Sequence, residues 1–162
     1  MTLLIFYLAL AIGVSFLCSI LEAVLLSMNS SYVTVLSKSK PRAGAILKDL
    51  KANIDRPLSA ILSLNTIAHT VGAAGVGAQA QVVFGNAYVS ITSAVLTLAI
   101  LIFSEIIPKT LGATYWKKLS AFAGYTTKGL IYVTYPLVLL SMGITKWLSR
   151  EDALKARGYV QV

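Results

Sequence analysis

Long apolar runs alternate with polar links along this chain, and the runs predict helices that cross a membrane. Four such runs stand out, at about residues 3–28, 58–80, 87–110 and 119–148. A bilayer core requires about 20 apolar residues in a helix, and each run reaches that length. The first three are expected to cross the membrane. The fourth is interrupted by Pro136, and each of its halves is too short to span.

The charges between the runs predict an orientation. The link at residues 29–56 is rich in lysine and arginine, which favours the cytoplasmic side of the membrane. The link at 81–86 carries no charge and is expected to be a short external turn. The basic residues Lys109, at the end of the third run, and Lys117 and Lys118, after it, are again expected inside. The N-terminus is therefore expected outside.

The fourth run has basic residues at both ends, so that a crossing would place four of them outside. We therefore favour juxtamembrane helices that lie along the inner surface or enter and return, with a turn at Tyr135 and Pro136. A fourth true span is the alternative. The polar tail at 151–162 is expected to be poorly ordered. The predicted fold class is an all-α membrane protein with three transmembrane helices and juxtamembrane helices on the cytoplasmic side.

The composition agrees with this class. Hydrophobic residues make up 57% of the chain and charged residues only 12%, whereas soluble domains carry about 25% charged residues. The net charge of +8 is spread over several links without a nucleic-acid-binding motif, so we do not expect nucleic acid as a partner. The single cysteine, Cys18, is expected to be a buried apolar residue. No catalytic constellation or phosphate-binding loop is recognisable, and the chain is not expected to be an enzyme.

Two acidic residues, Glu22 and Glu105, fall within the apolar runs. A charge at that depth costs roughly 2.5 to 3.5 kcal/mol on insertion scales, which makes each a candidate for function. For Glu22, which lies near the polar link, a snorkelling or helix-bridging carboxylate is the favoured interpretation. For Glu105 we expect a bound cation, rather than a lysine or a proton, to match the charge. Pro108 supports this, because it cannot donate a backbone hydrogen bond and frees the carbonyl of Ser104.

Neutral polar side chains are aligned on the same runs. The first run places Ser15, Ser19 and Glu22 on one helical face, and the second places Asn65 and His69 four residues apart. Hydroxyl, amide, carboxylate and carbonyl oxygens are ligands of hard cations such as sodium, magnesium or calcium. A lone histidine is more often a helix–helix hydrogen bonder than a metal ligand, and zinc or copper is not expected. The residues predict an intramembrane site for a hard cation.

Three motifs resemble the transmembrane domain of the CNNM/CorC family of magnesium transporters. They are SILEA at 19–23, LNTIAHT at 64–70 and FSEIIPKTLG at 103–112, and the last is the most specific. The resemblance covers about residues 2 to 150, nearly the whole chain. It implies a homodimer in the plasma membrane, which in a bacterium is the inner membrane. It also implies three spans with the N-terminus outside and the C-terminus in the cytoplasm, wrapped by a belt of membrane-associated helices.

The same resemblance implies export of magnesium driven by the inward sodium gradient. The ligands that it implies are Ser19, Asn65, Glu105 and a backbone oxygen near Gly112. The neighbours of these ligands on the same helical faces are Ser15, Ser63 and His69. His69 stands where we expect a second asparagine of the motif. Family members usually continue into cytosolic paired CBS domains, and these residues stop before such a region. Two rivals remain, a divalent-cation channel and a non-transporting membrane sensor or anchor with a structural ion.

Overall fold

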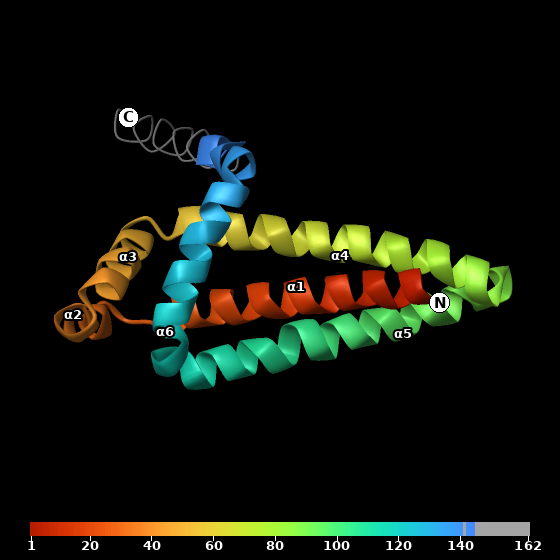
Figure 1. Ribbon diagram of the computed structural model, residues 1–162, viewed down its shortest axis with the longest axis horizontal. Coiled ribbons are helices and arrows are strands. Elements are labelled where there is room, and N and C mark those ends of the chain that lie inside the picture. Colours follow the sequence, from red (N-terminus) through yellow and green to blue (C-terminus); the bar gives the residue numbers. More distant parts are fainter. Residues whose placement is uncertain (141, 145–162) are drawn as a thin grey trace, which may run out of the picture.

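The computed structural model describes residues 1–140 and 142–144, which form a bundle of long helices (Figure 1). Within these residues every element is a helix and no strand is present. Three helical stretches of this described part are long and apolar enough to cross a membrane: α1 (Thr2–Ser27), α4 (Asp55–Phe84) and the stretch Asn86–Val133. The predicted all-α class with three transmembrane helices is therefore confirmed.

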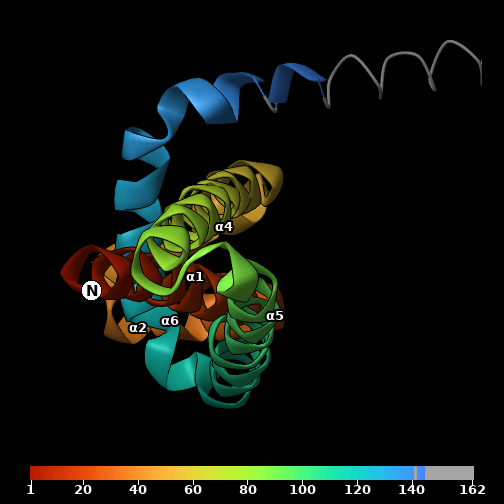
Figure 2. The same cartoon turned by 90° about the vertical axis from the view of Figure 1, so that its right-hand side faces the viewer.

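The third stretch contains four consecutive elements. They are η1 (Asn86–Tyr88), α5 (Val89–Ala99), the π-helix η2 (Ile100–Ile106) and α6 (Ile107–Val133). Gly85, whose positive φ of 86° suits a glycine, joins α4 to η1. In Figure 1, α1 lies between α4 and α5, so the first span is the central one. Figure 2 shows the same order along another direction.

The chain changes direction inside α6. Tyr115 has non-helical dihedral angles, with φ −104° and ψ 19°. Beyond it, residues 116–133 form a transverse arm across one end of the bundle (Figure 1). The bend is not at Pro108, the residue that was expected to free a backbone carbonyl beside Glu105. Pro108 instead occupies the first turn of α6, where its missing N–H is tolerated, directly after the π-helix.

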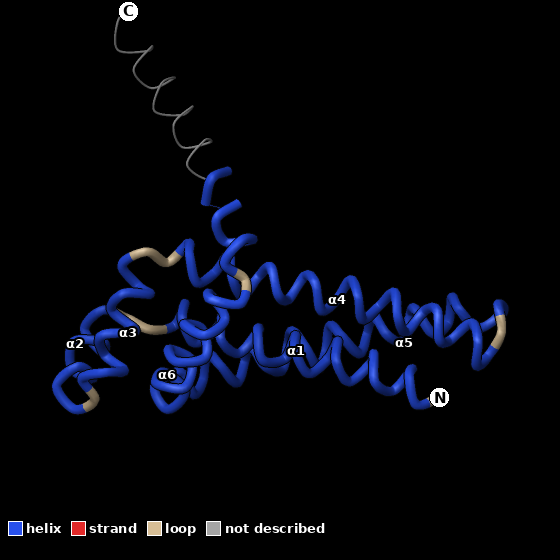
Figure 3. The backbone as a smooth tube through the Cα atoms, turned by 45° about the horizontal axis from the view of Figure 1, so that its top comes forward, coloured by secondary structure: helices blue, strands red, loops and turns tan. Residues whose placement is uncertain are grey.

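Two short helices lie at the same end of the bundle as the transverse arm. α2 (Ser30–Ser39) begins at Asn29, whose side chain accepts a 2.8 Å hydrogen bond from the Tyr32 N–H. α3 (Pro41–Ala52) begins with a proline, a residue that suits the first turn of a helix. The loops between the helices are short (Figure 3). The N-terminus lies near the opposite end of the bundle (Figure 1).

The hydrophobic core lies where α1, α3, α4 and the transverse arm meet. Its buried members include Leu21, Leu25, Leu47 and Ile61, and Cys18 is 1% exposed, as the sequence predicted. Farther along α1, the small residues of α4 allow close approach. A Cβ on Gly72 would collide with Ala11, and one on Gly75 would collide with the ring of Tyr7. These two glycines of α4 therefore pack against α1 within the subunit.

The expected juxtamembrane region begins as the transverse arm, which is continuous with the third span rather than a separate helix. The arm ends at Val133, and Thr134 forms a turn one residue before the expected position. Helical structure then resumes at Tyr135, so that Pro136 falls in a first turn. Leu137 of this segment lines a shallow pocket together with Leu62 of α4, and Val138 is buried in the hydrophobic core. The predicted residues 145–148 and the tail at 151–162 lie outside the described residues.

Candidate cation site

Glu105 is the centre of the candidate site, and it belongs to the π-helix. Such widened turns occur frequently at functional sites. Its Oε1 accepts a 3.2 Å hydrogen bond from Asn65 Nδ2 of α4, and His69 Nε2 lies 3.9 Å from the same oxygen. The second and third spans thus bring three of the predicted residues together around one carboxylate oxygen.

The first span joins this cluster through a hydroxyl. Ser15 is buried on α1, and its Oγ lies 2.5 Å from His69 Nε2. His69 therefore connects α1 with the carboxylate of the third span, in agreement with its expected role as a helix–helix hydrogen bonder. Ser19, one turn further along α1, is also fully buried.

Several buried oxygens in this region have no hydrogen-bond partner. Within the described residues, four such side-chain atoms are found: Ser19 Oγ, Asn65 Oδ1, Ser104 Oγ and Thr127 Oγ1. The first three come from α1, α4 and η2, one from each predicted span, and α1 contacts both other elements. A buried oxygen without a partner costs about 1 to 3 kcal/mol. A cation could satisfy these oxygens, and the donor set suits a hard one.

The other oxygen of Glu105 is paired with a lysine. Lys109 Nζ lies 2.9 Å from Glu105 Oε2 and 3.3 Å from Glu22 Oε2. The expectation that no lysine matches the charge of Glu105 was therefore wrong for this structure. The interpretation of Glu22 as a helix-bridging carboxylate is confirmed, because Lys109 links it to α6. The missed signal is the four-residue spacing of Glu105 and Lys109, which places them on one helical face.

The other two predicted site residues, Gly112 and Ser63, make contacts of a different kind. Gly112 is buried against α1, where a Cβ would lie 2.8 Å from Ala23 Cβ and 2.9 Å from the Ile20 carbonyl oxygen. The glycine therefore permits close contact between α6 and α1. Ser63 lies two residues before Asn65 and lines a shallow surface pocket with Leu137.

The described residues contain no group of three or more histidine, cysteine, aspartate or glutamate side chains that could hold a metal ion. The site therefore differs from a transition-metal centre. It combines one carboxylate with neutral oxygens, beside a second carboxylate and an ammonium. Sequence analysis considered the carbonyl of Ser104 but missed its buried hydroxyl, and it also missed the π-helix that begins at Ile100.

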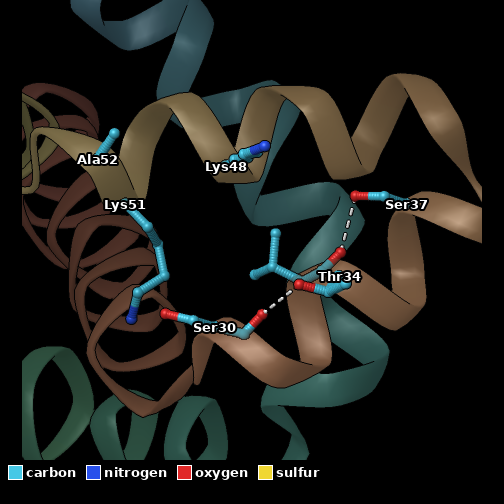
Figure 4. Close-up of a pocket in the computed structure, with 7 residues that line it drawn as sticks. Ser30, Thr34, Ser37, Lys48, Lys51 and Ala52 are labelled. Carbon is cyan, nitrogen blue, oxygen red and sulfur yellow. Dashed lines mark hydrogen bonds between the residues drawn. The ribbon is translucent and has the colours of Figure 1, made fainter.

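A separate pocket lies between α2 and α3, away from the predicted site residues (Figure 4). Lys48 and Lys51 come from α3, while Ser30, Thr34 and Ser37 come from α2. The hydroxyls of Thr34 and Ser37 donate to carbonyl oxygens one turn back, and the ammonium of Lys51 donates to the carbonyl oxygen of Met28. These three polar groups of the pocket therefore make hydrogen bonds within the local fold.

Comparison with known proteins supports the resemblance in the three motifs. A UPF0053 protein of Synechocystis, sll1254, is 35% identical over 129 residues, or 80% of this chain and 37% of that protein. A UPF0053 protein of Haemophilus influenzae is 33% identical over 134 residues, or 83% of this chain and 32% of that protein. The UPF0053 inner membrane protein YfjD of Escherichia coli is 28% identical over 134 residues, or 83% of this chain and 31% of that protein. The chain spans about a third of the length of these relatives.

The family comparison covers both the spans and the cluster around Glu105. Residues 5–156 match the family described as the cyclin M transmembrane N-terminal domain. This range includes nearly all of α1 and the whole of α4, η2 and α6. The chain is thus a multi-pass membrane protein that belongs to the CNNM family.

Proposed function

We propose that this protein transports magnesium ions through the site around Glu105. The observation that carries the proposal is the set of unpartnered buried oxygens, Ser19 Oγ and Asn65 Oδ1, on the two spans that face this carboxylate. Magnesium prefers such hard oxygen donors, demands near-octahedral geometry and usually keeps several waters. One carboxylate with a few neutral oxygens meets that requirement.

Each residue has a distinct part in this proposal. Glu105 supplies the negative charge, Ser19 and Asn65 supply neutral oxygens, and a backbone oxygen near Gly112 completes the protein's share. His69 orients the group, because it contacts both Ser15 and the carboxylate. The inward sodium gradient would drive export of the ion, with the spans rocking around the site. We further propose that two subunits associate in the inner membrane, the location that the name of the Escherichia coli relative states for that protein.

The experiment is a magnesium-efflux assay with the 162-residue chain in liposomes, with and without sodium outside. Glu105→Gln removes the charge but keeps the size of the side chain. Binding measured by calorimetry and flux should both fall by roughly tenfold or more, because a buried ion loses its compensating charge. Asp49→Asn is the matched control, since Asp49 is exposed on α3.

The same assay separates the rival functions. Flux that persists without a sodium gradient, at rates far above carrier turnover, would identify a channel. Binding without flux in any condition would identify a sensor or anchor. Near-native magnesium affinity in the Glu105→Gln variant would contradict the assignment of the site itself.

A further inference from the structure

The ammonium of Lys109 lies between two carboxylates on different helices. It is 2.9 Å from Glu105 Oε2 on the π-helix and 3.3 Å from Glu22 Oε2 on α1. The two acids and the lysine together carry one net negative charge. The proposed transport site therefore contains an internal cation that belongs to the protein.

The lysine is the most exposed member of this trio. Its side chain is 44% exposed, whereas those of Glu22 and Glu105 are 19% and 23% exposed. Lysine is also a point charge on a flexible four-carbon stem. Glu105, in contrast, is held on its other side by the hydrogen bond from Asn65.

A divalent cation bound to Glu105 would repel the Lys109 ammonium that contacts the same carboxylate. An ion that used Glu105 together with Ser19 Oγ and Asn65 Oδ1 would lie close to the Lys109 ammonium. Like charges at such separations repel strongly in surroundings of low dielectric constant. Glu22 offers the displaced ammonium a second partner without any large movement, since the two are already in contact.

We propose that Lys109 is a tethered counter-ion that neutralises Glu105 when no metal is bound and moves onto Glu22 when the metal arrives. This inference rests on the proposed function. Lys109 compensates the charge of Glu105 in the empty site. Without it, an unpaired carboxylate in apolar surroundings would be costly. In sodium-driven exchange the site is empty between release of one ion and binding of the other, and Lys109 would neutralise Glu105 during that interval.

Magnesium calorimetry on the chain in lipid nanodiscs tests the competition. Lys109→Met removes the competitor and should tighten binding about five-fold, as for loss of a half-exposed ion pair. Glu22→Gln leaves the lysine with Glu105 alone and should weaken binding. In the double variant the Glu22 change should have no further effect, so that its affinity equals that of Lys109→Met. Lys118→Met, an exposed lysine of the same helix, is the control.

Flux measurements test the same competition. In Lys109→Met, sodium-driven efflux should reach half of its maximum at a several-fold lower magnesium concentration, because the ion no longer competes with the ammonium for Glu105. A purely structural link between α1 and α6 would lower the maximum flux without lowering the half-saturating magnesium concentration, and that result would overturn the proposal.

The remaining outcomes are also decisive. If the native chain neither binds nor moves magnesium, the proposed function fails and this inference falls with it. If the native chain binds magnesium but Lys109→Met binds it no more tightly, only the counter-ion proposal fails. If Lys109→Met is not monodisperse, Glu22→Gln alone decides, because unchanged or tighter binding in that variant contradicts the role of Glu22.

Discussion

Ser19 and Thr127 are both buried hydroxyls whose oxygens lack a partner among the residues that the structure describes. Ser19 belongs to the central span and was predicted as a ligand. Thr127 belongs to the transverse arm, beyond the bend at Tyr115. Comparing the two residues therefore tests whether the unpartnered oxygen of Ser19 binds a cation, as we propose.

Replacing Ser19 with alanine should separate stability from binding. Removing an unsatisfied buried hydroxyl costs little, so the free energy of unfolding without metal should change by less than about 1 kcal/mol. Magnesium affinity should fall about tenfold, because an interaction with a charged group is lost. Thermal unfolding without magnesium measures the change in stability. The additional stabilisation in the presence of magnesium measures the affinity, because a ligand that binds the folded state more tightly stabilises it more.

Thr127→Val is the control for this pair. It removes a comparable hydroxyl while keeping the volume of the side chain, and the magnesium-induced stabilisation should remain native. Equal loss of magnesium-induced stabilisation in both variants would show that Ser19 has no special part in the site.

At the scale of elements, the long apolar runs were enough to predict the three long helices. The alignment of Asn65 with His69, and of Ser15 with Ser19, likewise predicted which faces meet. The bend at Tyr115 was not predictable, because it arises where α6 leaves the bundle to pack across α1, α3 and α4. The ion pairs of Lys109 were missed for a similar reason. The sequence shows which residues share a helical face, whereas the conformation of the lysine side chain decides which carboxylates it contacts.

The contact between α6 and α1 depends on the absence of a side chain at Gly112. Gly112→Ala should destabilise the protein by about 1 to 3 kcal/mol, because the added Cβ meets the Ile20 carbonyl oxygen at 2.9 Å and a backbone atom cannot give way cheaply. Gly129→Ala is the matched control on the same helix, where a Cβ meets nothing within 4 Å. That change should leave stability unchanged or raise it by roughly 0.5 to 1 kcal/mol. Similar unfolding midpoints for both variants would contradict the close-packing interpretation.

At the scale of the whole molecule, the two ends of the bundle differ in charge. One end has the uncharged turn around Gly85 with the N-terminus nearby, and the other has α2, α3 and the transverse arm (Figure 1). The second end carries most of the basic residues: Lys38, Lys40, Arg42, Lys48, Lys51, Arg56, Lys117 and Lys118. Because basic loops are retained in the cytoplasm, we expect this end to face inward. The trio of Glu22, Glu105 and Lys109 would then lie nearer the cytoplasmic end.

Cysteine labelling of intact cells tests this orientation. Cys18 is buried and is first replaced by alanine, which leaves a parent without cysteine. A cysteine in place of exposed Ala87, in the turn after α4, should react with a membrane-impermeant maleimide from outside. One in place of exposed Ser39, at the end of α2, should react only after lysis. The reverse pattern would place the basic end outside, and the metal would then reach Glu105 from the opposite side to the one that export requires.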